Sequence, residues 1–361
     1  MPETASITGL RARPVIVPMA RPLVTAGGAV TQAPLVLVDL ETDAGAAGRA
    51  YSFAYHPWVL GPLKAMIDIL GEKITGRPLD PPARQADLFA ALRLVGARGV
   101  AGMALSALDM AAWDALGRLK GQPLCRMLGA DAVTVPAYNS KGLGMIGAAK
   151  AAREAKELAD EGFPAIKVRL GYPTLEEDVA VARAVVGAVP GVRVMSDYNQ
   201  SQTADEVIRR VQALDDLGLD WVEEPVAYDD FKGHLALRAR VNTPVQTGEN
   251  CWFAADMEKA LEAGACDLFM PDAGKIGGVT GWLAAAKVGA GYKVPLSSHL
   301  FPEVSVHLLA ATPTRHWLEY VDWAAPVLQE PLPVTDGACR PPERPGIGMD
   351  WDEAAVARYA A

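Results

Sequence analysis

The sequence predicts an α/β protein in which a TIM-like barrel of parallel strands follows a smaller α+β domain. The 361 residues exceed a typical domain, but they suit one barrel of about 250 residues with a smaller partner. From about residue 133, short β-rich runs alternate with helical stretches, a pattern typical of repeated βα units around a parallel sheet. Half of the residues are hydrophobic and 21% are charged, so the chain can bury a large core.

These patterns divide the chain into three parts. Residues 1–132 are expected to form the α+β domain, because residues 35–40 alternate as in a strand and residues 103–119 carry apolar side chains at helical spacing. Residues 133–321 hold the barrel. Residues 322–361 are rich in Pro and Gly, and we expect them to return to the first domain and pack on it.

The barrel prediction rests on eight β-rich runs with helices between them. A helix over residues 145–161 should end at Gly162, and residues 174–177 and 203–206 have the form of capping boxes that begin later helices. The helices therefore follow the runs, as a βα repeat requires. The runs are residues 133–140, 165–170, 193–199, 220–225, 244–250, 268–275, 293–299 and 316–321.

Three acidic residues end neighbouring runs, on the face where barrel enzymes carry their reactive groups. Asp197, Glu223 and Glu249 are spaced 26 residues apart, one βα repeat each, so their carboxylates should converge. Like charges repel unless a cation lies among them, and oxygen-only ligands favour Mg²⁺. The other reading is that these are ordinary loop acids or helix N-caps. The net charge of −9 argues against a general nucleic-acid binder.

Asp272 and His299 end the next two runs. An aspartate beside a histidine fixes its tautomer and raises its basicity, which makes His299 a candidate general base. A lone histidine is more often structural, and this reading stays open. Lys275, in the sequence PDAGKIGG, is a rival base.

Two cations, Lys167 and Arg169, lie two residues apart on one strand and so share a face. One of them could bind a substrate carboxylate while the other stands near the reacting carbon; the alternative is a salt-bridged barrel interior. A hydrogen beside a carboxylate is a very weak acid, because its removal leaves an enediolate. Mg²⁺, Lys167 and a protonated Glu319 together would stabilise that charge.

A chain of motifs resembles the enolase superfamily, mandelate racemase subgroup. These motifs include ITGLRAR, DMAAWDALG, KVRLGYP, SDYNQS, WVEEP, PDAGKIGGVTGW and SSHLF, in order along nearly the whole chain. The resemblance implies a modified (β/α)₇β barrel, an α+β N-terminal capping domain over residues 1–132 and a C-terminal segment that returns to it. In this group a Lys or His base works with Mg²⁺ on an enediolate.

The resemblance also implies roles for single residues. Asp197, Glu223 and Glu249 would bind one Mg²⁺ per subunit, and Asp272 with His299 would form an acid/base dyad. A lid over residues 20–30 would close on the substrate, with Leu23, Val30 and Tyr55 lining the pocket. The residues implied to contact substrate are Lys167 and Glu319 at its carboxylate, Asn199 at the 2-hydroxyl side, and Ser140 at the carboxylate or a metal-bound oxygen.

Arg169 departs from the family pattern, in which a second lysine is the base on the face opposite the histidine. An arginine has a pKa above about 12 and is a poor base at neutral pH. Similarity along the whole chain favours a racemase of 2-hydroxy acids, whereas Arg169 favours the close alternative, an acid-sugar dehydratase that uses His299 alone. A catalytically silent binding protein is a remote one.

The expected partner is a small 2-hydroxy carboxylate, with no nucleic acid and no membrane. The resemblance implies a homo-oligomer, up to an octamer. The four cysteines lack paired spacing, and the first residues form no apolar targeting segment, so we expect a cytoplasmic location.

Overall fold

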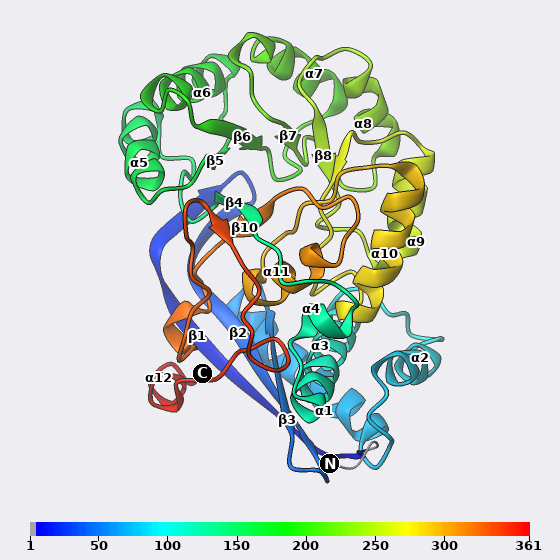
Figure 1. Ribbon diagram of the computed structural model, residues 1–361. Helices are drawn as coiled ribbons and strands as arrows, with labels where there is room; N and C mark the ends of the chain where they lie inside the picture. Colours follow the sequence, from blue (N-terminus) through cyan, green and yellow to red (C-terminus); the bar gives the residue numbers. More distant parts are fainter. Residues whose placement is uncertain (1–4) are drawn as a thin grey trace.

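The computed structural model describes residues 5–361. Its first domain contains an antiparallel sheet in the order β1-β2-β3. Strands β1 (Ile7–Thr25) and β2 (Gly28–Thr42) form a long hairpin whose tip reaches the barrel, and β3 (Ala47–Phe53) follows (Figure 1). The tip docks through a backbone hydrogen bond in which the Met145 N–H donates to the Val24 carbonyl at 2.7 Å.

The helices of this domain pack on the sheet and on one another. They are η1 (Pro57–Val59), α1 (Leu60–Ile74), α2 (Pro81–Ala91), α3 (Val100–Lys120) and α4 (Leu124–Met127). Helix α3 is mostly buried and packs against β3 at Gly48, where a Cβ would lie 2.0 Å from the Ala111 carbonyl oxygen. Glycine permits this close approach, which seats α3 between the sheet and the barrel.

The second part of the chain forms a curled parallel sheet with helices outside it, as Figure 1 shows. The sheet has the order β10-β4-β5-β6-β7-β8-β9, which brings the last strand beside the first. Its strands are β4 (Val135–Asn139), β5 (Ala165–Arg169), β6 (Arg193–Asp197), β7 (Val222–Glu223), β8 (Val245–Thr247), β9 (Leu268–Phe269) and β10 (Leu318–Tyr320). The α/β fold class predicted from the sequence is confirmed.

The helices of the barrel follow the strands. They are α5 (Ala148–Asp160), α6 (Leu175–Ala188), α7 (Ala204–Gln212), η2 (Asp215–Leu217), α8 (Phe231–Arg238), α9 (Phe253–Glu262), α10 (Gly278–Tyr292) and α11 (Pro302–Ala310). Thr174 and Glu177 form the predicted capping box at the start of α6. At α7 the Thr203 side chain accepts the Glu206 N–H, which is half of such a box. No helix among residues 5–361 is long and apolar enough to cross a membrane.

The seventh expected run, residues 293–299, differs from the prediction. It forms no strand, and single bridges of Leu296 to Phe269 and to Arg315 join it to its neighbours. Lys293 has a φ of 57° and Pro295 lacks an N–H, so regular pairing cannot continue through this stretch. A bridge between Asp272 and His299 nevertheless brings these two residues side by side.

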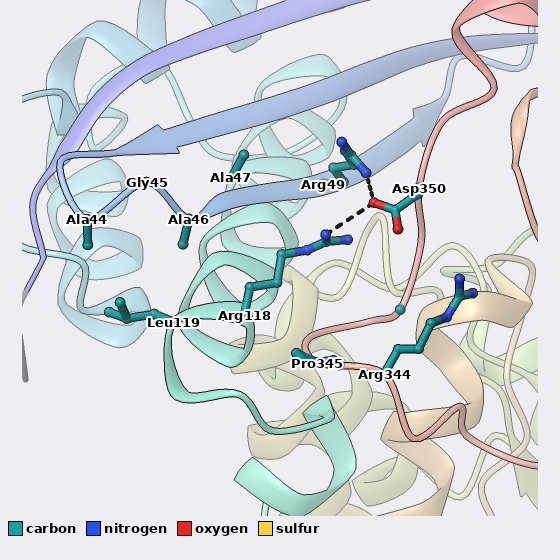
Figure 2. Close-up of a pocket in the computed structure, with 11 residues that line it drawn as sticks. Ala44, Gly45, Ala46, Ala47, Arg49, Arg118, Leu119, Arg344, Pro345 and Asp350 are labelled. Carbon is teal, nitrogen blue, oxygen red and sulfur yellow. Dashed lines mark hydrogen bonds and ion pairs between the residues drawn. The ribbon is translucent and has the colours of Figure 1, made fainter. Parts of the chain in front are cut away.

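The last residues run back across the first domain. This part contains η3 (Ala325–Val327), β11 (Ala338–Cys339), which pairs with β4, and α12 (Glu353–Arg358). The Trp351 indole N–H donates to Asp39 at 2.7 Å. Figure 2 shows Arg49 of β3 and Arg118 of α3 both pointing at Asp350, beside a cavity of about 530 Å³. The C-terminal segment thus closes over the first domain through one buried hydrogen bond and two partly exposed ion pairs.

Candidate active site

A cavity of about 140 Å³ lies at the C-terminal ends of the strands, below the tip of the β1–β2 hairpin. One part of its lining is charged or polar and comes from the barrel: Lys167, Arg169, Asp197, Asn199, Glu249, His299 and Glu319. The other part is mostly apolar and comes from the hairpin, β3 and the segments after the last two runs: Leu23, Thr25, Val30, Phe53, Tyr55, Leu300 and Trp323. Such a cavity suits a small molecule with a charged end and a compact apolar end.

The Lys167 ammonium lies among the carboxylates and is 2% exposed. It contacts Glu223, and it is 2.8 Å from Glu319 and 3.4 Å from Asp197. Burial disfavours the charged amine, but these carboxylates raise the pKa of Lys167 above its ordinary value. It therefore remains a cation at the centre of the site.

Glu319 departs from the protonated state expected from the sequence. Burial alone would raise its pKa, but the Lys167 ammonium and the His299 ring hold the pKa well below the usual range. The Leu300 N–H also donates to its carboxylate at 2.8 Å. The side chain is thus an ionised partner of Lys167 in this arrangement.

The three carboxylates predicted as metal ligands stand at or just beyond the ends of adjacent strands β6, β7 and β8. Asp197 accepts the Asn199 N–H at 2.8 Å and the Asn199 side-chain amide at 3.0 Å. Glu223 accepts the Trp221 indole N–H at 3.0 Å. Within residues 5–361 no three His, Cys, Asp or Glu side chains are grouped at metal-binding distance, and the Lys167 ammonium contacts both Asp197 and Glu223.

His299 and Asp272 form the predicted dyad. The His299 Nδ1 lies 2.5 Å from an Asp272 oxygen, and the other Asp272 oxygen accepts the Gly274 N–H at 2.6 Å. A carboxylate at Nδ1 places the proton on that nitrogen and leaves Nε2 as the basic atom. Burial lowers the pKa of His299, but the charges of Glu249, Glu319 and Asp272 raise it to about 9.

Arg169 is buried on the same strand as Lys167, and backbone carbonyls hold it. Its Nη1 donates to the Gly142 carbonyl at 2.6 Å and to the Ser140 carbonyl at 3.3 Å. Its Nη2 donates to the Ser140 hydroxyl at 2.8 Å. Ser140, predicted to contact substrate, therefore lies behind Arg169 and is not among the residues that line the cavity.

Lys275, the rival base, points elsewhere. Its amine donates to the Asn250 side chain at 2.6 Å and lies 4.6 Å from the centre of the Tyr55 ring. Asn250 in turn donates to Glu224 at 2.8 Å. The Tyr55 ring lines the cavity, whereas Lys275 does not. This arrangement favours a supporting role for Lys275.

The structure adds wall residues that the sequence patterns did not single out. Phe53 ends β3 two residues before Tyr55, with the ring centroids 4.7 Å apart, and Trp323 packs on Phe53 at 5.0 Å. The alternation of Tyr51, Phe53 and Tyr55 is a signal that could have placed Phe53 beside the predicted lining. Trp323 and Leu300 carry no comparable signal, since both lie in irregular segments.

Comparison with known protein families covers both parts of the chain. The description "Mandelate racemase / muconate lactonizing enzyme, N-terminal domain" matches residues 7–129. The description "Enolase C-terminal domain-like" matches residues 150–355. These two ranges include the hairpin that closes the cavity and the predicted site residues of the barrel from Lys167 to Glu319.

Similar proteins include several enzymes that act on sugar acids. L-talarate/galactarate dehydratase from Salmonella typhimurium is 29% identical over 90% of this chain and 82% of its own length. The 3,6-anhydro-alpha-L-galactonate cycloisomerase from Streptomyces coelicolor is 30% identical over 92% of this chain and 93% of its own.

Two solved structures agree with the fold over nearly the whole chain. An enolase from the alpha proteobacterium BAL199 with bound Mg is 41% identical, covers 99% of this chain and 100% of its own, and has a TM-score of 0.97. An enolase from Bradyrhizobium complexed with magnesium and mandelic acid is 43% identical, covers 100% of both chains and has a TM-score of 0.95. The chain therefore belongs to the mandelate racemase / muconate lactonizing enzyme family of the enolase superfamily, as its motifs indicated.

Proposed function

We propose that the protein is a Mg²⁺-dependent enzyme that removes the α-proton of a 2-hydroxy carboxylate from one face, with His299 as the base. The observation that carries this proposal is the pair of side chains at the cavity. Asp272 holds His299 at Nδ1 and the Nε2 atom lies 3.3 Å from Glu249 at the cavity, whereas Arg169 is a guanidinium held by carbonyls. With a pKa of about 9, His299 keeps a small neutral fraction near pH 7 that can take the proton, whereas a guanidinium with a pKa above about 12 keeps almost none.

The residues present suit a divalent cation. The region holds four buried carboxylates, those of Asp197, Glu223, Glu249 and Glu319, and three of them surround Lys167. The buried Oδ1 of Asn199 has no hydrogen-bond partner among the described residues. Oxygen donors of this kind favour Mg²⁺, which both similar structures contain. Asp197, Glu223 and Glu249 would hold the ion. When bound, it would stabilise negative charge on the substrate carboxylate as the proton leaves.

The other polar side chains would hold the substrate. Lys167 is placed to pair with a carboxylate oxygen, and Glu319 holds Lys167 in position at 2.8 Å. Asn199 would orient the 2-hydroxyl group. The apolar walls exclude water from the reacting carbon, which strengthens each of these electrostatic contacts.

Syn dehydration is the outcome that this one-sided arrangement supports best. The C2–H bond breaks and the proton passes to His299 Nε2. The C3–O bond then breaks while His299 returns the proton, so that water leaves and the enol product becomes a 3-deoxy-2-keto acid. The sequence alone favoured racemisation; the carbonyl contacts of Arg169 shift the preference, because racemisation needs a second proton carrier on the other face.

Racemisation of an aryl 2-hydroxy acid is the second candidate. The apolar cavity wall favours it, as does the similar structure from Bradyrhizobium, which holds mandelic acid. Racemisation would require exchange of the α-proton in both enantiomers of one acid, whereas dehydration requires a 3-hydroxyl group.

Proton exchange in D₂O with added Mg²⁺ tests the proposal across a panel of sugar acids and the two mandelate enantiomers. We expect exchange or turnover with substrates of one α-configuration, and loss of both in His299→Asn. His56→Asn, at an exposed histidine, is the matched control and should retain full activity. Exchange that persists in His299→Asn would refute the assignment of the base. No exchange with any acid would favour a binding protein.

The assembly and location of the protein remain predictions. A homo-oligomer, up to an octamer, and a cytoplasmic location are proposed on the family resemblance and on the sequence. Light scattering of the purified protein would give the number of subunits directly.

A further inference from the structure

We propose that Arg169 determines substrate specificity: its remaining N–H groups bind an oxygen on the substituent of the reacting carbon, on the side opposite His299. This inference rests on the proposed function in placing the substrate carboxylate beside Lys167. It assigns to the arginine a binding role in place of the proton transfer that a lysine performs at this position in the family pattern.

The first line of evidence is the charge of the cavity. Arg169 lines it and is only 4% exposed. Lys167, two residues away, has three carboxylates within 4 Å. Arg169 has none within that distance in the part of the chain that the structure describes. A buried cation without an anion gains strongly from a ligand that brings an oxygen to it.

The second line of evidence is the count of donors. A guanidinium has five N–H groups. The two at Nη1 are used by backbone carbonyls, and one at Nη2 is used by Ser140. The buried Nε–H has no partner among residues 5–361, and one N–H at Nη2 also lacks an acceptor. A buried donor without an acceptor costs free energy. A substrate oxygen at this position would therefore increase binding affinity, whereas an apolar group would not.

The third line of evidence is how firmly the group is held. The Arg169 backbone N–H donates to Leu143 at 2.9 Å, and the loop that it contacts also receives the hairpin tip at Val24. The guanidinium is therefore oriented before substrate binds, which reduces the entropic cost of each hydrogen bond. A flexible lysine at this position could not make the same set of contacts.

Paired ligands that differ by one hydroxyl group test the inference by calorimetry with Mg²⁺ present. The pair is 2,4-dihydroxybutanoate and 2-hydroxybutanoate, which differ by a hydroxyl group that does not leave in the proposed dehydration, and it is measured in the His299→Asn background so that no turnover occurs. We expect the dihydroxy acid to bind about tenfold more tightly, as one hydrogen bond to a charged donor gives. In Arg169→Met this preference should fall to about twofold or less.

Arg169→Lys is a second variant that keeps the positive charge, and circular dichroism would show whether it remains folded. This variant should also lose most of the preference for the dihydroxy acid, because the single lysine nitrogen cannot reach both the Ser140 contacts and the substrate oxygen. A preference that survives in both variants would overturn the proposal, as would an equal loss of affinity for the two ligands. Because binding is measured without turnover, failure of the proposed reaction would instead show as absent α-proton exchange in the unaltered enzyme.

Discussion

The imidazole of His299 depends on the single carboxylate behind it. Asp272 accepts the Nδ1 proton at 2.5 Å and so leaves Nε2 free to take a proton. Asp272→Asn would present an amide N–H to Nδ1 and favour the opposite tautomer, in which Nε2 is already protonated. We expect the proton-exchange rate to fall by about 10²- to 10⁴-fold.

Isothermal calorimetry of Mg²⁺ with Asp272→Asn separates this effect from damage to the site. Metal affinity should stay within about threefold of the unaltered protein, because Asp272 is not a proposed ligand. A large loss of metal affinity would mean that Asp272 acts through the metal ligands, and the tautomer argument would then fail.

The acidic residues of the site could be predicted from the sequence because they recur with the βα repeat. Asp197, Glu223 and Glu249 recur at one βα spacing, and the strand ends bring their side chains into one region. The cavity wall could not be predicted from a repeat: Leu23, Val30 and Tyr55 came from the family resemblance, and Trp323 and Leu300 were not predicted. Trp323 and Leu300 lie in irregular segments without any period, and their positions depend on how the C-terminal segment and the hairpin pack together.

At the scale of elements, the contact between β3 and α3 depends on Gly48. A Cβ there would lie 2.0 Å from the Ala111 carbonyl and 2.6 Å from the Ala115 nitrogen, both of them backbone atoms that cannot move alone. Gly48→Ala should therefore lower the free energy of unfolding by about 3 kcal/mol or more, measured by urea denaturation.

Gly61→Ala is the matched control for this change. Gly61 lies in helix α1, and a Cβ there would meet nothing within 4 Å. Alanine favours helix over glycine, so this variant should gain about 0.5–1 kcal/mol. Equal stability of the two variants would show that the packing of β3 on α3 tolerates a side chain.

A buried carboxylate also joins α3 to α10. Asp109 accepts the Thr280 N–H at 2.9 Å and its hydroxyl at 2.5 Å. Burial nevertheless raises the pKa of Asp109 from 3.8 to about 7. Since the folded pKa lies above the unfolded one, the stability from this group is complete at low pH and is lost as pH rises through about 7.

Asp109→Asn should remove this dependence, because a neutral amide has no charge to bury. Relative to the unaltered protein, the variant should gain up to about 4 kcal/mol between about pH 4 and about pH 8, in proportion to the shift of about three pKa units. Urea denaturation across this range measures the difference. Parallel stability curves for the two proteins would show that Asp109 is ionised in the fold at little cost.

At the scale of the whole molecule, metal binding should stabilise the fold as well as support the reaction. A ligand at 100 times its Kd adds about 2.7 kcal/mol, which raises Tm by a few degrees for a chain of this size. We expect Mg²⁺ to produce such a rise and EDTA to reverse it. Glu249→Gln should reduce the rise by at least half, as measured by scanning fluorimetry.

Glu258→Gln, at an exposed residue of α9, is the control for the loss of one negative charge. It should keep the full Mg²⁺-dependent rise in Tm. If Glu249→Gln kept it as well, Glu249 would not be a ligand and the ion would have to bind elsewhere.

The path of the C-terminal segment fixes when the first domain can be completed. Trp351 covers Asp39, a residue 312 positions earlier in the chain, and Asp350 receives two arginines of the same domain. During synthesis, Asp39 and the two arginines therefore remain without their C-terminal partners until nearly the whole barrel has left the ribosome. The earliest domain to emerge is thus among the last to be finished, and a ribosome stalled before residue 350 would carry a chain whose first domain still lacks its cover.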